Sequence, residues 1–117
     1  MPVPLPSTAR LAATLAIIGL LALGGSASGS SSSTTVRLQD TAVHPPRVFI
    51  RRGATVTWRF LDGANDEAHT VTSYGRLRFA STGPHKTGSY SVRFTHRGTY
   101  LYMCSIHFNM QGRIIVG

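Results

Sequence analysis

The chain has 117 residues, enough for one small domain, and carries 12 Lys and Arg against 4 Asp and Glu, a formal net charge of +8. Its only cysteine is Cys104, which excludes an internal disulfide. The basic residues are spread along the chain instead of forming a cluster, so we expect no nucleic-acid partner.

The first 27 residues have the three parts of a secretory signal. Residues 1–10 are proline-rich with one positive charge, residues 11–23 are almost wholly apolar, and small residues follow. The apolar run is short for a membrane span, which needs about 20 residues, and no cysteine lies nearby to accept a lipid. We therefore predict cleavage after Ala27 and export to the periplasm or the exterior. The alternative is an uncut segment that holds the chain at a membrane.

Residues 28–35 are rich in Ser, Thr and Gly and are predicted to form a flexible tether. The folded domain is then expected to span residues 36–117. Without the signal segment, 11 basic and 4 acidic side chains remain, a net charge of +7. This charge favours an acidic protein or an anionic membrane face as a partner, although a solvated surface that keeps a small protein soluble explains it equally well.

The domain shows β patterns throughout. Two runs, residues 55–60 and 90–95, alternate strictly between apolar and polar side chains, which is typical of a strand with one buried face. Further short segments rich in β-branched and aromatic residues are also predicted strands: residues 48–50, 69–73, 76–80, 99–103 and 113–116. Gly and Pro separate these segments, and no useful helical period follows Leu23. The sequence thus predicts an all-β sandwich or barrel.

A possible metal site lies near the C-terminus. Cys104, His107 and Met110 are spaced Cys-x2-His-x2-Met directly after a predicted strand, and a loop there can turn all three side chains toward one point. His69 stands upstream at the start of another predicted strand. Two imidazoles, one thiolate and one weak thioether are the ligand set of a type 1 copper site. We therefore predict that these four residues bind one copper ion.

Other interpretations of the same residues remain open. Zinc prefers four strong N, S or O ligands, so Met110 argues against zinc only if it is a ligand. Methionine is also an ordinary core residue, and a lone cysteine is often a buried apolar one. The remaining histidines, His44, His85 and His96, lie near turn residues and are expected at the surface.

Nearly all of residues 36–117 resembles the plastocyanin and amicyanin family of cupredoxins. The resemblance includes the stretch Gly53-Ala54-Thr55-Val56-Thr57-Trp58, the segments around His69 and Tyr90, the run from Phe94 to Cys104, and the tail from Gly112 to Val116. It implies an eight-stranded Greek-key β-sandwich with copper at one end, bound by His69 from one loop and by the other three ligands from the last loop. The short ligand loop resembles that of amicyanins and pseudoazurins.

The sequence departs from the family in two places, the segment from Phe60 to Ala68 and the residue after His107. The family usually has an Asn two residues after this Trp, where it helps to tie the two ligand loops; here the position is Phe60, and Asp62 or Asn65 are candidate substitutes. The loop from Leu61 to Ala68 is also longer than in many relatives. Phe108 stands where amicyanins carry Pro after the second His.

The resemblance implies a one-electron carrier that cycles between Cu(I) and Cu(II) outside the cytoplasm and is not an enzyme. Redox proteins are then expected to dock near His107, the more exposed ligand, and Phe108, and an acidic partner would suit the net charge. Nothing in the sequence demands more than a monomer. The alternative is a module that stores or delivers copper without electron transfer, although only two methionines, Met103 and Met110, follow the signal segment.

Overall fold

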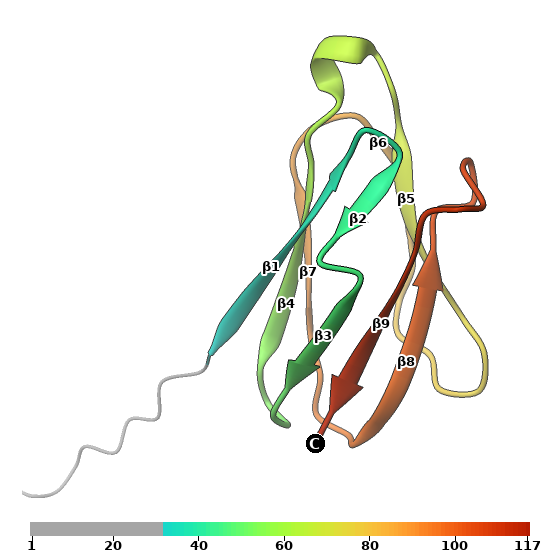
Figure 1. Cartoon of the computed structure of the whole chain (residues 1–117). Coiled ribbons are helices and arrows are strands. Elements are labelled where there is room, and N and C mark those ends of the chain that lie inside the picture. Colours follow the sequence, from blue (N-terminus) through green and yellow to red (C-terminus); the bar gives the residue numbers. More distant parts are fainter. Residues whose placement is uncertain (1–31) are drawn as a thin grey trace, which may run out of the picture. The chain divides into compact units, whose positions relative to one another are not determined.

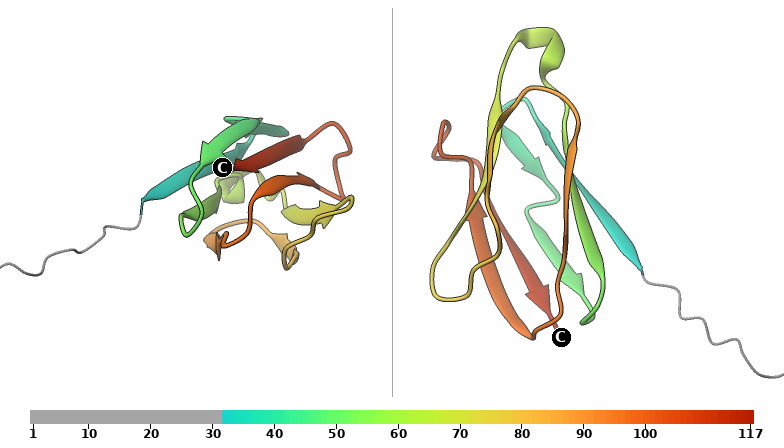
Figure 2. Two further views of the ribbon diagram at one scale, coloured as in Figure 1. Left: turned by 90° about the horizontal axis from the view of Figure 1, so that it is seen from below. Right: turned by 180° about the vertical axis from the view of Figure 1, so that it is seen from behind.

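A computed structural model describes residues 32–117, which form nine strands in two sheets packed face to face (Figures 1 and 2). The predicted signal segment and the first residues of the predicted tether lie outside the described residues. The all-β prediction is confirmed. Among the described residues, no helix is long and apolar enough to cross a membrane.

One sheet has four strands in the order β2-β1-β4-β7. Its strands are β1 (Ser33–Gln39), β2 (Ala42–His44), β4 (Thr55–Phe60) and β7 (Ser89–Arg93). The other sheet has five strands in the order β3-β9-β8-β5-β6. Its strands are β3 (Arg47–Ile50), β5 (His69–Tyr74), β6 (Thr82–His85), β8 (Gly98–Met103) and β9 (Gln111–Val116). The pairs β1–β4 and β3–β9 are parallel, whereas the other pairs are antiparallel.

The core lies between the two sheets and is centred on Trp58. The alternation predicted for residues 55–60 is present: Val56, Trp58 and Phe60 are buried, whereas Arg59 is exposed. The Trp58 ring stacks on Phe79 at 5.4 Å between centroids and meets the edge of Tyr102 at 5.3 Å. Aromatic pairs at these distances stabilise a core beyond the area that they bury.

The strand predicted at residues 76–80 is wrong, because this segment is a loop between β5 and β6. Hydroxyl groups take the place of the backbone ladder there. Phe79 donates its backbone N–H to Ser73 Oγ at 3.1 Å, and the Ser73 N–H donates to Ser81 Oγ at 2.9 Å. Because Phe79 packs into the core from this loop, the segment has the apolar spacing of a strand without forming one.

The first strand begins earlier than the expected domain start. Ser33, Thr34 and Thr35 belong to β1 and run parallel to Thr55–Thr57 of β4. A Ser and Thr segment can join a sheet edge in this way because the pairing uses backbone groups and threonine suits a pleated strand.

The predicted metal ligands lie at the ends of strands, at one end of the sandwich. His69 is the first residue of β5, Cys104 follows the last residue of β8, and Met110 precedes the first residue of β9. In Figure 1 this is the upper end, where the loop between β4 and β5, the turn between β1 and β2, and the loop between β8 and β9 are found. The sheets therefore fix where the ligand-bearing loops begin and end.

Candidate metal centre

The loop from Cys104 to Met110 is closed by its own backbone. Cys104 donates its N–H to the Met110 carbonyl at 2.9 Å, and Met110 donates its N–H to the His107 carbonyl at 2.9 Å. Met103 and Gln111 pair at the ends of β8 and β9 directly beneath it. A short loop tied at both ends has few conformations left, so it holds its Cys, His and Met in fixed relative positions.

His69 has a buried nitrogen with no hydrogen-bond partner. Its side chain is fully buried, and its Nε2 lies 2.6 Å from Asp62 Oδ2, whereas Nδ1 has no partner. Buried polar atoms are nearly always paired, so an orphaned ring nitrogen requires an explanation. A metal ion is a natural one, because imidazole binds metals through one nitrogen while the other donates to a carboxylate.

Two further donor groups lie close to the His69 ring. One ligand atom from each of His69, Cys104 and His107 lies within 4.8 Å of the others. The Cys104 Sγ is 3.7 Å from Nδ1 of His107, and the two imidazole rings are 5.1 Å apart between centroids. Met110 is 1% exposed and is tied by its backbone to the other two residues of its loop. The structure therefore brings all four predicted site residues together.

The environment of Cys104 favours its thiolate form. The side chain is 2% exposed, and this burial alone would raise the pKa of the thiol. Hydrogen bonds from the backbone N–H groups of Thr70, Ile106 and His107 outweigh the burial and lower the pKa below its ordinary value. The Thr70 N–H lies 3.4 Å from Sγ. Because the thiolate is the form that binds metal, the protein prepares this group to act as a ligand.

Thr70 ties the two ligand loops together. Its hydroxyl oxygen accepts the Ser105 N–H at 2.8 Å, and it lies 3.1 Å from Ser105 Oγ. Neither Asp62 nor Asn65, the candidates considered from the sequence, bonds to the loop between β8 and β9. The residues directly after the two ligands His69 and Cys104 thus make the connection. Thr70, a hydroxyl residue next to His69, was the available sign of this connection in the sequence.

Asp62 has a different role, since it holds the buried ligand ring. It is 2% exposed, and its Oδ2 accepts the backbone N–H of Asp40 at 2.8 Å in addition to His69. Burial would raise the pKa of this carboxyl, but the hydrogen bonds that it accepts from His69 and Asp40 lower it. The carboxylate is therefore ionised and fixes the orientation of His69 from behind.

His107 contacts a second carboxylate. Its Nε2 lies 3.1 Å from Glu67 Oε2, and its side chain is 21% exposed. The other histidines, His44, His85 and His96, are exposed as expected, and none of them belongs to the cluster.

Comparison with known proteins places this arrangement in a family. A family model described as a cupredoxin-like domain matches residues 11–116. The chain belongs to the cupredoxin family. It is 31% identical over 88 residues to amicyanin-alpha of Methylorubrum extorquens, and this match covers 74% of this chain and 73% of that protein. It is 32% identical over 72 residues to amicyanin of Paracoccus denitrificans, with 61% of this chain and 55% of that protein covered.

Solved structures agree with this membership. A Cu(I) form of an amicyanin variant matches with a TM-score of 0.61 and 28% identity, covering 73% of this chain and 82% of that one. A purple cupredoxin from Nitrosopumilus maritimus matches with a TM-score of 0.61 and 21% identity over 72% of this chain and 99% of that one, which supports the fold alone.

The donor set of this cupredoxin fits copper. A thiolate and a thioether suit Cu(I), and imidazole suits both oxidation states, whereas a thioether is not a ligand that zinc prefers. The cluster of His69, Cys104, His107 and Met110 can bind one type 1 copper ion, as expected for an amicyanin-like electron carrier.

Proposed function

We propose that this cupredoxin carries single electrons outside the cytoplasm, with His69, Cys104, His107 and Met110 as the ligands of its copper. The observation that carries the assignment is the buried, unpartnered Nδ1 of His69 beside the Cys104 thiol and the His107 ring. When bound, copper supplies a centre that changes by one electron between Cu(I) and Cu(II).

The protein's contribution is to keep the ligands still. Cys104 would bind as thiolate and Met110 as the weak axial ligand, while Thr70, Asp62 and the closed loop hold their surroundings in place. Hydrogen bonds to the Cys sulfur and the axial thioether are the levers that set the potential of such a centre. Little has to move when the oxidation state changes, because the scaffold fixes the geometry.

Storage or delivery of copper is the second candidate, and burial argues against it. His69, Cys104 and Met110 are each at most 2% exposed, so an incoming metal acceptor meets only the edge of His107. Cupredoxins are electron carriers rather than enzymes, and we propose the same here. Four protein ligands leave no open position on the metal for a substrate.

Repeated redox cycling separates a carrier from a delivery module. We expect the copper-loaded chain to keep its metal through many rounds of one-electron reduction and oxidation in the presence of a Cu(I)-specific chelator, because three ligands are shielded. The colour of the chelator complex measures any release. Stoichiometric transfer of copper to the chelator within the first reductions would contradict the electron-carrier role and favour delivery.

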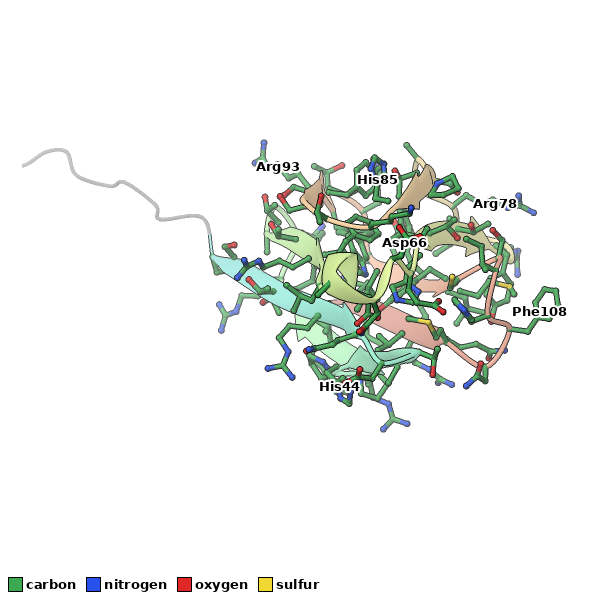
Figure 3. All side chains as sticks on the ribbon, turned by 90° about the horizontal axis from the view of Figure 1, so that it is seen from above. His44, Asp66, Arg78, His85, Arg93 and Phe108 are labelled. Carbon is green, nitrogen blue, oxygen red and sulfur yellow. The ribbon has the colours of Figure 1, made fainter. Side chains whose placement is uncertain are left out.

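We propose that redox partners dock around His107, through an apolar patch made of Ile106 and Phe108. His107 is the most exposed of the four ligands. Its neighbours Ile106 and Phe108 are 47% and 71% exposed, and Figure 3, seen from above, shows Phe108 extending sideways beyond the other side chains. Small apolar contacts of this kind suit brief encounters between redox proteins.

Two phenylalanines of equal exposure allow a controlled test of the patch. Phe108 and Phe49 are both 71% exposed, but Phe49 lies on β3, outside the ligand loops. We expect Phe108→Ser to slow electron self-exchange between Cu(I) and Cu(II) copies by about tenfold, the size of a lost contact at the centre of an interface. Phe49→Ser should leave the rate unchanged. The rate is measured from NMR line broadening, and equal effects of the two variants would refute docking at the patch.

The loops at the two ends of the sandwich carry opposite net charges. The loops at the copper end, residues 40–41, 61–68, 86–88 and 104–110, hold all four acidic side chains and one lysine, a net charge of −3. The turns at the opposite end, residues 51–54, 75–81 and 94–97, hold five arginines, a net charge of +5. The net positive charge of the chain suggested an acidic partner, but these positions favour a partner with basic groups at the copper end.

Small redox reagents of opposite charge test this proposal. We expect oxidation of the Cu(I) chain by a tripositive cobalt–phenanthroline complex to slow as salt is added, because local attraction is screened beyond about 8 Å at physiological ionic strength. Oxidation by anionic hexacyanoferrate(III) should not slow. The double variant Arg51→Gln, Arg97→Gln, altered at the far end, is the control and should keep both salt responses. A uniformly positive protein would give the opposite result: added salt would slow oxidation by hexacyanoferrate(III) and not by the cobalt complex. That result would show that the local charge has no part in docking.

We further propose that residues 1–27 are an export signal and that the copper domain works in the periplasm or outside the cell as a monomer. An uncut N-terminal segment would leave it associated with a membrane. The lone thiol supports an exported metal site, because a free cysteine in an oxidising compartment needs protection. N-terminal sequencing of the exported chain tests the cleavage: a chain that begins at Met1 would contradict it.

A further inference from the structure

The long loop between β4 and β5 reaches both histidine ligands. Asp62 contacts Nε2 of His69 at 2.6 Å, and Glu67 contacts Nε2 of His107 at 3.1 Å. Nδ1 of His69 has no other partner, and Nδ1 of His107 lies 3.7 Å from Cys104 Sγ. In each ring, one nitrogen therefore faces a carboxylate and leaves the other for the cluster.

The shape of this loop explains how two of its carboxylates point at the site. A short 3₁₀ turn, Gly63–Asn65, follows Asp62, and the backbone N–H groups of Asn65 and Glu67 both donate to the Asp62 carbonyl at 3.1 Å. Asp66 then adopts a left-handed conformation with φ of 58°, which reverses the chain, and its side chain pairs with Lys86. Aspartate tolerates this conformation better than most residues.

The loop between β4 and β5 is also fixed by close contact with Thr87. A Cβ atom on Gly63 would come within 2.4 Å of Thr87 Cγ2, so the loop lies against the segment between β6 and β7. Asp62 is anchored to the Asp40 N–H as well. Glu67 is thus presented to His107 by a loop held at several points.

We propose that Glu67 is a positioning residue for His107: it holds the exposed ligand ring through Nε2 and covers part of the ring edge. The proposal rests on His107 being a copper ligand. A hydrogen-bond acceptor on the outer nitrogen fixes the tautomer and rotation of a ligating imidazole. With Asp62, Glu67 gives both imidazoles the same support from one loop.

An ordinary surface ion pair is the competing interpretation. Glu67 is 46% exposed, and exposed pairs of this kind contribute little to stability. The two interpretations differ in what they predict for the ligand. If Glu67 forms only a surface pair, its removal has no effect on metal binding. If it positions His107, metal binding weakens when the hydrogen bond is removed, but not when the charge alone is removed.

Asp66 provides a matched control because it is adjacent, carries the same charge and contacts Lys86 instead of a ligand. We expect Glu67→Ala to weaken Cu(II) binding about tenfold in competition with a chelator of known affinity, within the range seen when such supporting groups are removed. Glu67→Gln keeps an oxygen acceptor for Nε2–H and should restore binding to within about twofold of the wild type. Asp66→Ala should also stay within that range.

The metal-free chain provides an independent measurement. In ¹⁵N NMR spectra at neutral pH, we expect the His107 ring to carry its proton on Nε2 and to show a slowly exchanging N–H signal in the wild type, Glu67→Gln and Asp66→Ala chains. In Glu67→Ala this signal should be lost to exchange with water. Equal copper affinities and equal ring signals in Glu67→Ala and Asp66→Ala would overturn the proposal. If the wild-type chain took up no Cu(II), the proposed function would fail, and the ring signals alone would decide the role of Glu67.

Discussion

A buried imidazole nitrogen without a hydrogen-bond partner is the constraint on which the copper end of this protein depends. His69 is fully buried, its Nε2 is bound by Asp62, and its Nδ1 is left free beside a thiol whose pKa is lowered. In a domain of this size, an unpaired polar atom costs a substantial part of the net stability. The cost is reasonable only if something binds there, and a cation that accepts thiolate, thioether and imidazole donors satisfies every group at once.

The scaffold around this site is built to resist movement. Strand ends fix where each ligand begins, the loop between β8 and β9 is closed by its own backbone, and Thr70 joins it to the segment of His69. The loop between β4 and β5 adds one carboxylate behind each imidazole. Rigidity of this kind suits electron transfer, because a centre that keeps its geometry in both oxidation states reorganises little. We propose that the exposed apolar residues and the charges of the loops then decide which partners can approach.

Much of this could be predicted from the sequence, and the failures have physical causes. The spacing of Cys104, His107 and Met110 predicted a site because three candidate ligands lie in one short loop, and the structure brings this loop to His69. Alternation at Val56, Trp58 and Phe60 identified a buried strand. The strand predicted around Phe79 is wrong, because hydroxyl groups of Ser73 and Ser81 replace the strand-to-strand hydrogen bonds that a sequence pattern assumes. Glu67 could not be assigned, since its contact with His107 joins two loops far apart in the chain and depends on the left-handed turn at Asp66.

The most direct test of a type 1 copper site is a visible absorption titration of the purified chain with Cu(II), alongside Cys104→Ser. Charge transfer from thiolate to copper requires Cys104 as a ligand. The site described here predicts an intense visible band that reaches its maximum at one equivalent of Cu(II) and is absent from Cys104→Ser. Pale or colourless binding, or a band that survives in Cys104→Ser, would show that the thiolate is not a copper ligand and would contradict the site and the electron carrier built on it.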